Sequence, residues 1–376
     1  MDKYLHIISL NIPWPANYGG VIDIFYKLKA LHRLGVRIIL HTFEYERPHA
    51  PELEKYCEQV YYYKRKTGLI TNLSALPYNV VSRKNPLLLQ RLLENNYPIL
   101  FEGLHSCYYL SDKILQDRVK IVRASNVEHD YYYYLYKAEK NWVKRTFFLI
   151  ESKRFALFER NIRYADLVLA ISENDERSLK SRFPAEMVKL IPAFHANESI
   201  TSREGSSDFM LYHAKLSVVE NENAALFLIE NVFSKLPYTC IIAGMNPSSV
   251  LINAAKPYSN IRIEANPSNE KMSTLIEEAQ IHALVTFQDT GLKLKLLNSL
   301  FAGRHVLVNS LMLAGSGLDS LCHQADTAEE MVSQCNKLMQ IPFDQAEISR
   351  RKEKLFPTYD NNFQAQRLFD MIYADN

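Results

Sequence analysis

Short apolar runs alternate with longer amphipathic stretches along the first half of the chain. LHIISL (5–10) predicts a buried strand, the Pro-, Asn- and Gly-containing NIPWPANYGG (11–20) a loop, and VIDIFYKLKALHRLG (21–35) an amphipathic helix ended by glycine. VRIILHTF (36–43) predicts the next strand. A strand, glycine loop, helix and strand in this order form a βαβ unit, whose strands run parallel in a doubly wound sheet.

The same alternation predicts two α/β domains. Further strands of the first domain are predicted at QVYYY, PILFEGL, VKIVRAS, DLVLAIS and VKLIP, the last ending at Pro192. Residues 193–208 are polar and are typical of a linker, so we place the domain boundary after residue 192. A second alternation follows, with strands at FMLYHA, YTCIIAG, NIRIEA, IHALVTF and RHVLVN, and no helix is predicted between YTCIIAG and NIRIEA. We therefore predict Rossmann-like domains at 1–192 and 193–376, with a C-terminal helix at about 361–376 that can pack back onto the first domain.

Composition narrows the class of protein. With 376 residues, 47% hydrophobic and 23% charged, the chain is long enough for two cores. A net charge of +2 gives no overall field that would favour nucleic acid as a partner. The five cysteines contain no CxxC pair and favour a reducing compartment, and no apolar stretch approaches the roughly 18 residues of a membrane span. We expect a cytoplasmic protein without bound metal or cofactor.

The segment TGLKLKLLNSLFAGRHVLVN (290–309) is the strongest candidate for chemistry. A predicted strand leads through a short polar stretch into a helix that we expect to start at Gly291. Free N–H groups at a helix start suit a diphosphate, and Lys293 and Lys295 add positive charge. Asn298 can hydrogen-bond a ribose. On periodicity alone, an ordinary core helix with solvated lysines is the favoured interpretation of the same segment.

This segment resembles the nucleotide-sugar site of glycosyltransferase family 4, in the form GxxxKxLEAxAxGxPVV. Gly291, Lys295, Leu297, Gly303 and Val306 are in register with it. Other stretches match in the same order along nearly the whole chain: PxNYGGxxD, EGLH, RxxNVEHxYY, AxxxLAIS and YHxxLS. Within the family, the chain is most similar to bacterial members that build surface polysaccharides.

The resemblance implies a GT-B fold and transfer of a hexose, such as mannose, from a nucleoside diphosphate sugar to a glycan or lipid-linked acceptor. It also implies retention of the anomeric configuration without a metal ion. The diphosphate would then be stabilised by positive charge and backbone amides. The donor-binding residues would be Gly19, Gly20, Ala214, Lys215, Thr290, Gly291, Leu292 and Asn298. The acceptor-side residues would be Asp23, Glu102, His105 and Arg123, and the catalytic residues Asn126, Glu128, His129, Lys293 and Lys295.

The chain also departs from the family pattern. Ser125 stands where the family has a histidine before the asparagine, and Ala214 stands where a glycine is expected. The family's paired glutamates correspond to Thr290 and Asn298, so neither carboxylate is present. These losses leave two alternatives open: a scaffold protein that has kept the fold and lost catalysis, and a GT-B sugar-nucleotide epimerase.

Residues 131–164 combine aromatic and basic side chains. They contain eight lysines and arginines against three glutamates, in a chain that is nearly neutral. A basic aromatic helix of this kind can lie on the anionic inner-membrane surface, where lipid-linked acceptors are found. The alternative is a long helix that packs on the first sheet and exposes a solvated basic face.

Overall fold

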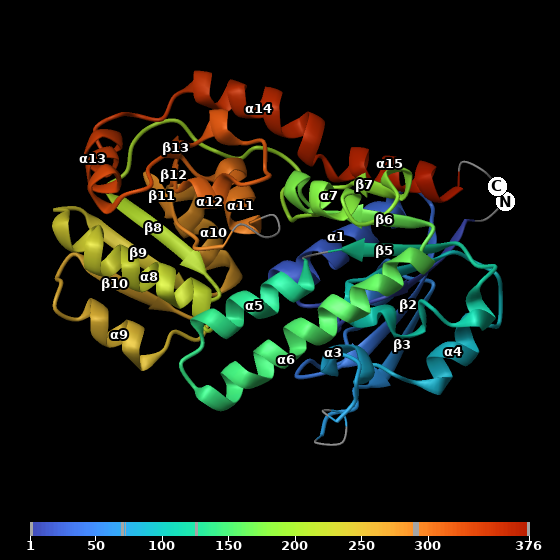
Figure 1. Ribbon diagram of the computed structural model, residues 1–376. Helices are drawn as coiled ribbons and strands as arrows, with labels where there is room; N and C mark the ends of the chain where they lie inside the picture. The colour runs from blue at the N-terminus through green and yellow to red at the C-terminus, as the bar shows by residue number, and fades with distance from the viewer. Residues whose placement is uncertain (1–2, 69–70, 72, 125–126, 289–292, 374–376) are drawn as a thin grey trace. The chain divides into compact units, whose positions relative to one another are not determined.

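The computed structural model describes residues 3–68, 71, 73–124, 127–288 and 293–373 (Figure 1). The chain divides into two compact units. The first unit contains the described residues up to His195 and those from Tyr359 onward, and the second contains the described residues between Ala196 and Thr358.

The first unit is built on a seven-stranded parallel sheet of order β3-β2-β1-β4-β5-β6-β7. Its strands are β1 (Tyr4–Ile8), β2 (Arg37–Glu44), β3 (Gln59–Lys64), β4 (Ile99–Glu102), β5 (Lys120–Ala124), β6 (Leu167–Ala170) and β7 (Val188–Leu190). Its helices are α1 (Gly19–Arg33), α3 (Tyr78–Val81), α4 (Pro86–Leu92), α5 (Glu128–Ala138), α6 (Trp142–Phe158), α7 (Glu173–Lys180) and α15 (Asn361–Tyr373). Every residue of β4 and β5 is buried, as expected of parallel strands covered on both faces.

Each face of this sheet carries its own core. On one face, side chains of β1 such as Leu5 and Ile7 pack with Leu28 of α1 and Leu368 of α15. On the other face, the core includes Phe101 and Val122 together with residues of α5 and α6. The C-terminal helix α15 therefore completes the core of the first unit, and the Tyr373 hydroxyl donates a hydrogen bond to the carbonyl of Tyr4 at 2.9 Å.

The second unit contains a six-stranded parallel sheet of order β10-β9-β8-β11-β12-β13. Its strands are β8 (Phe209–Ala214), β9 (Thr239–Gly244), β10 (Ile261–Ala265), β11 (Ile281–Leu284), β12 (His305–Val308) and β13 (His323–Gln324). Its helices are α8 (Val219–Asn231), α9 (Ser249–Ala255), α10 (Asn269–Glu278), α11 (Leu294–Ala302), α12 (Ser310–Leu313), α13 (Ala328–Leu338) and α14 (Gln345–Tyr359), the last ending at the boundary between the units. Both sheets confirm the predicted α/β class.

The structure moves the predicted domain boundary and adds elements. Residues 193–195 are buried in the first unit, where the N–H of Phe194 donates to Asp23, so the boundary follows His195 rather than Pro192. Helix α9 joins the parallel strands β9 and β10, which were predicted without a helix between them. Within the described residues, no helix is long and apolar enough to cross a membrane.

Candidate functional site

In the second unit, Lys295 lies in the first turn of α11, near the carboxyl end of β8. Its ammonium donates to the Tyr212 hydroxyl at 3.4 Å and to Asn221 Oδ1 at 3.3 Å, and it lies 5.0 Å from the centre of the Tyr212 ring. These partners are uncharged and the hydrogen bonds are long. Burial, opposed by Glu220 and reinforced by Lys293, lowers the pKa of Lys295 to about 8. The site thus holds a partly desolvated cation that a bound anion would stabilise.

A glutamate that the sequence analysis missed holds the loop after β11. Glu220, in the first turn of α8, accepts hydrogen bonds from the Thr286 hydroxyl and from the Gln288 side-chain amide. The Asn309 side chain also holds Thr286, accepting from its N–H at 3.2 Å and donating to its carbonyl at 2.7 Å. The only sequence signal for Glu220 was its position after the YHAKLS strand end, at the start of a polar helix.

The start of α11 differs from the prediction. The helix begins at Leu294, with Lys293 as the N-cap, and not at Gly291. The first turn of a helix leaves its N–H groups without intrahelical partners, so the diphosphate hypothesis now rests on the N–H groups of residues 294–296. One of them is already engaged, because the N–H of Leu296 donates to the Lys293 carbonyl at 2.8 Å. The predicted donor residues Thr290, Gly291 and Leu292 lie outside the described residues.

Other predicted donor residues lie near this helix. Asn298 is on α11, and its Oδ1 accepts a hydrogen bond from the Asn197 side chain at 3.0 Å. Ala214 is the last residue of β8, and the carbonyl of the exposed Lys215 accepts from Asn221 at 3.1 Å. Lys215 and Lys295 are thus connected through Asn221, in the first turn of α8.

Between α11 and the sheet lie buried residues, among them His213 and His282, which set the distance of the helix from the strands. His213 Nε2 lies 3.1 Å from the Ser299 hydroxyl, and burial lowers the pKa of His213 to about 3, so its imidazole is neutral. Gly303 follows α11 with φ −91°, and a Cβ there would come within 2.0 Å of His282 Nε2. Gly303 is therefore required by close packing rather than by a left-handed helix cap.

In the first unit, the glycine pair lies inside a helix and not in the predicted loop. Gly19 and Gly20 are the first two residues of α1, after Tyr18 as N-cap. The Tyr18 carbonyl accepts from the N–H groups of Val21 and Ile22 at 3.1 and 3.0 Å. The N–H groups at the first two helical positions are those that a helix cannot satisfy internally, so a phosphate or acceptor group remains the expected ligand of this turn.

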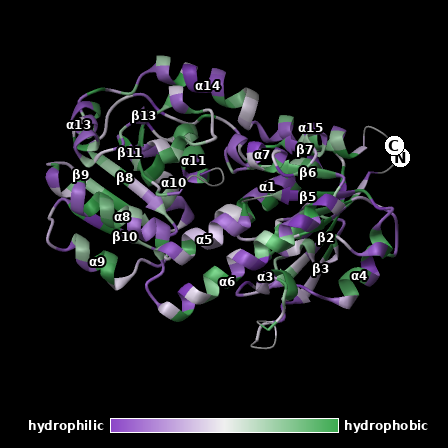
Figure 2. Ribbon diagram, viewed as in Figure 1, coloured by the Kyte–Doolittle hydropathy of each residue, from purple (hydrophilic) through white to green (hydrophobic). Residues whose placement is uncertain are grey.

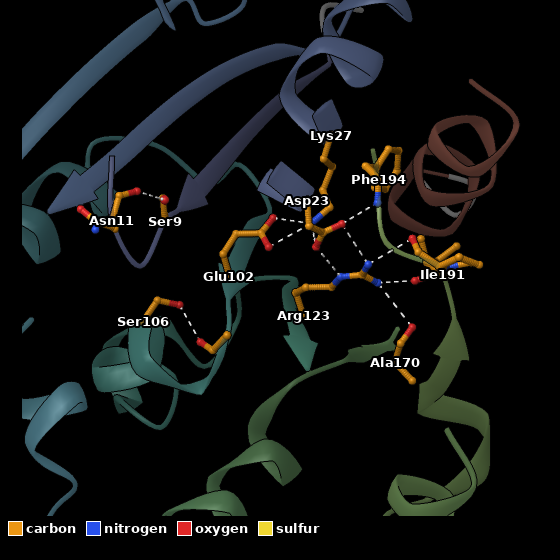
Figure 3. Close-up of polar contacts among 12 residues, drawn as sticks. Ser9, Asn11, Asp23, Lys27, Glu102, Ser106, Arg123, Ala170, Ile191 and Phe194 are labelled. Atoms are coloured by element: carbon orange, nitrogen blue, oxygen red, sulfur yellow. Dashed lines mark hydrogen bonds and ion pairs between the residues drawn. The ribbon is translucent and has the colours of Figure 1, made fainter. Parts of the chain in front are cut away.

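Three predicted acceptor-side residues belong to a buried ion network, which also includes Lys27 (Figure 3). The Lys27 ammonium, 0% exposed, donates to Asp23 Oδ2 at 3.2 Å and to both Glu102 oxygens at 2.7 and 2.9 Å. Arg123 donates to the two Asp23 oxygens at 3.0 and 3.1 Å. Two cations and two carboxylates thus join α1 to β4 and β5.

The network is internally neutralised. Burial alone would raise the pKa of Asp23, but Arg123 and Lys27 outweigh burial and hold it at about 2. Burial raises the pKa of Glu102, and the attraction of Lys27 only partly offsets it. The remaining Arg123 donors bond the carbonyls of Ala170, Ile191 and Pro192.

This geometry revises the role predicted for Arg123. Its guanidinium is fully buried and all of its N–H groups have partners inside the unit, so it cannot also hydrogen-bond a sugar as predicted. Asp23 and Glu102 are likewise engaged, and together these residues position α1 and the segment after β7. Lys27 was missed in the sequence, although its i, i+4 spacing from Asp23 on α1 was a usable signal.

The two predicted catalytic residues at the start of α5 lie in different surroundings: Glu128 is buried, and His129 is half-buried. Glu128 is buried, and its Oε2 has no hydrogen-bond partner among the described residues; the nearest predicted residue, His105, has Nε2 at 3.6 Å. Burial raises the pKa of Glu128 to about 8, with Glu159 contributing, and burial lowers that of His105 to about 3. Both side chains are therefore neutral near pH 7. The unsatisfied oxygen of Glu128 is a candidate contact for an acceptor hydroxyl.

His129 is half-buried and is held by a carboxylate. Its Nδ1 lies 2.8 Å from Glu159 Oε2, which also accepts from Arg182 at 2.7 Å. The hydrogen bond with Glu159 raises the pKa of His129. Asn126, the other catalytic candidate in this motif, lies outside the described residues.

Comparison with known proteins identifies the architecture. No family model matches the chain. A Klebsiella pneumoniae protein named as an uncharacterized 44.6 kDa protein in the cps region is 24% identical over 405 residues, covering 98% of this chain and 99% of that protein.

Two solved structures resemble the whole chain. Sucrose-phosphate synthase from Thermosynechococcus elongatus has a TM-score of 0.73 at 13% identity and covers 100% of both chains. HepE from Anabaena, solved in complex with UDP and glucose, has a TM-score of 0.67 at 12% identity and covers 99% of this chain and 100% of its own. At these identities the likeness shows the fold alone: the chain consists of two parallel α/β sheets that match GT-B glycosyltransferase structures.

Proposed function

We propose that this chain transfers a hexose from a nucleoside diphosphate sugar to a glycan or lipid-linked acceptor during polysaccharide assembly. The observation that carries the proposal is Lys295, a partly desolvated ammonium in the first turn of α11 whose hydrogen-bond partners in the described part of the chain are uncharged. Two similarities support it: HepE was solved with UDP and glucose, and the Klebsiella relative is named for a cps region.

In this proposal, the second unit binds the donor. The bond between the anomeric carbon and the diphosphate oxygen breaks, and the oxygen of an acceptor hydroxyl forms the new glycosidic bond with retention of configuration. The hydroxyl proton passes to the leaving diphosphate. Negative charge that develops on the leaving diphosphate is stabilised by Lys295, by Lys293 and by N–H groups at the start of α11. Charge stabilisation by these groups takes the place of a metal ion.

The first unit contributes the acceptor side. Glu128 is neutral near pH 7, and its Oε2 has no hydrogen-bond partner in the described part of the chain. It would accept a hydrogen bond from an acceptor hydroxyl or donate one to it. His129, oriented by Glu159, is the second candidate contact. Asp23, Glu102 and Arg123 act as positioning residues, because their polar atoms are engaged with one another and with Lys27.

Thermal unfolding with UDP, GDP and their hexose conjugates tests donor binding. A nucleotide that binds only the folded protein at about 100 times its Kd adds about 2.7 kcal/mol to the free energy of unfolding. We expect one nucleotide series to raise Tm, and Lys295→Ala to weaken its binding by ten- to a hundredfold, as for a lost hydrogen bond to a charged group at about 1.5–3 kcal/mol. Lys352→Ala, which removes an exposed lysine from α14, is the matched control and should leave the affinity unchanged.

A catalytically inactive scaffold is the second candidate function. It is favoured by Asn298, which replaces a carboxylate of the family pattern and whose Oδ1 already accepts from Asn197. If the protein binds a nucleotide but transfers no sugar to any acceptor present in cell extracts, the scaffold function is supported. Absence of a Tm shift with every nucleotide at millimolar concentration would contradict the transferase proposal.

A further inference from the structure

One face of helix α6 exposes large apolar residues to solvent. Trp142 is 76% exposed, Ile150 44% and Leu157 62%. Together with the exposed Thr146 and Lys153, they follow each other at intervals of three or four residues, which places them in one stripe along the helix. We call this stripe, together with Val143 at 56% exposure, the outer face of α6.

The opposite face of α6 is fully used by the core of the first unit. Phe155 and Phe158 are buried there, and the Phe155 ring stacks on Tyr132 of α5 with centroids 5.0 Å apart. Helices α5 and α6 lie side by side as a hairpin (Figure 1). Figure 2 shows hydrophobic and hydrophilic residues alternating along α6. Core packing therefore accounts for the inner apolar face and leaves the outer face without a partner among the described residues.

The charge around this outer face is strongly positive. The exposed basic residues of the hairpin and the turn that follows it are Lys137, Lys140, Lys144, Arg145, Lys153, Arg160 and Arg163. In the described part of the chain, none of these side chains forms an ion pair with a carboxylate. Glu151 and Glu159 are buried and bind Arg154, His129 and Arg182, so they do not neutralise the surface. Two partly exposed carboxylates remain on the hairpin: Glu139, which accepts from the N–H of Asn141, and Asp130, which lies beside His129. The seven exposed basic residues outnumber them.

We propose that the outer face of α6 and the basic turn between α5 and α6 dock onto an anionic lipid surface. The apolar side chains would enter the headgroup region, with Trp142 at the interface, while the lysines and arginines contact lipid phosphates. Lysine is depleted in protein–protein interfaces, whereas a basic helix with single apolar residues matches the chemistry of an anionic bilayer. The proposal does not depend on sugar transfer and is tested without activity.

Co-sedimentation with vesicles tests the electrostatic part. The full chain should bind vesicles of phosphatidylcholine with about 30% phosphatidylglycerol, bind pure phosphatidylcholine vesicles much more weakly, and dissociate as salt is raised. Lys140→Gln/Lys144→Gln should lower the partition coefficient by about ten- to thirtyfold, at roughly 1 kcal/mol for each basic residue. The matched control, Lys352→Gln/Lys354→Gln on α14, makes the same change in charge at exposed positions of the second unit and should bind normally.

Tryptophan fluorescence tests the apolar part. The chain has only two tryptophans, Trp14 and Trp142, so Trp14→Phe leaves Trp142 as the single reporter. Anionic vesicles should shift its emission to the blue, and brominated lipid should quench it. Trp142→Ser should reduce partitioning by roughly tenfold, because binding scales with buried apolar area. Phe363→Ser, at a residue of α15 that is 53% exposed, should have no effect.

Two results would overturn the proposal. One is an unchanged Trp142 emission with anionic vesicles while the protein remains folded by circular dichroism. The other is a concentration-dependent dimer in light scattering that Trp142→Ser abolishes, because that would show a second copy of the chain, and not lipid, as the occupant of the outer face.

Discussion

The two units use buried charge in opposite ways. In the first unit, Lys27 and Arg123 are matched by Asp23 and Glu102 at hydrogen-bond distances of 2.7–3.2 Å. In the second unit, the hydrogen-bond partners of Lys295 among the described residues are a hydroxyl and an amide oxygen, at 3.3–3.4 Å. Glu220 is close enough to favour the charged form of Lys295, but its oxygens are bonded to Thr286 and Gln288.

Because of this difference, we expect the charged residues of the first unit to act on stability and Lys295 to act on ligand binding. A neutralised network has no remaining affinity for a charged ligand, but removal of one member leaves an unpaired charge in the core. A desolvated cation with neutral partners contributes little to stability and gains much from a bound anion. We therefore expect mutations in the first network to affect unfolding and mutations at Lys295 to affect ligand binding.

The largest expected effect is on stability. Lys27→Met leaves Asp23 and Glu102 with a single cation and should lower the free energy of unfolding of the first unit by about 3–5 kcal/mol. Both tryptophans lie in that unit, so urea unfolding followed by fluorescence reports on it. Lys27→Met/Glu102→Gln should recover a large part of the loss, since it removes the uncompensated carboxylate. A loss of less than 1 kcal/mol in the single variant would contradict a tightly coupled network.

The second prediction concerns pH and Glu128. Its pKa is raised from 4.5 to about 8, so its contribution to stability is fully present below about pH 4.5 and is lost as pH rises through about 8. Glu128→Gln cannot ionise. The difference in unfolding free energy between wild type and this variant should therefore change by about 4 kcal/mol between pH 5 and 9, with the wild type losing more. Parallel pH profiles for the two proteins would show that Glu128 is solvated.

Much of the fold could be predicted from the sequence, because both sheets are parallel and buried. Strands such as β8 and β9 appear as nearly continuous apolar runs, and their ends agree with the prediction within a residue or two. Helix α9 was missed because SVLINAA is short and its pattern is weak. The parallel pairing of β9 and β10 nevertheless requires a crossover, so the helix was implied by the topology.

The candidate site was less predictable. Asp23, Glu102 and Arg123 were found as polar residues near strand ends, but a linear pattern does not show whether such side chains face a ligand or one another. Asp23 pairs directly with Arg123, whereas Glu102 joins them through Lys27, on the helix face that packs against β4. Glu220 was missed for a related reason, because its partners Thr286 and Gln288 are more than 60 residues away along the chain.

A third prediction uses the pKa of Lys295 to test the binding side of the comparison. That pKa is lowered to about 8, and only the protonated amine attracts a diphosphate. The affinity for a nucleoside diphosphate sugar, measured by calorimetry, should fall up to about tenfold from pH 7 to pH 9. Lys295→Arg keeps its charge over this range and should bind with little dependence on pH. An equal pH dependence in both proteins would place the titrating group elsewhere.

The smallest expected effect comes from placing a carboxylate at Asn298, where the pattern of glycosyltransferase family 4 has a glutamate. In Asn298→Glu, the side chain can still accept from Asn197 and offers a charged acceptor for ribose hydroxyls, which gives a stronger hydrogen bond than an amide. Nucleotide affinity should rise by a few fold, or about 0.5–1 kcal/mol, with little change in the stability of the second unit. Asn298→Gln, which has the same length and no charge, is the control. If both variants weaken binding equally, the Asn197–Asn298 contact itself supports the site, and Asn298 is then a positioning residue rather than a ribose ligand.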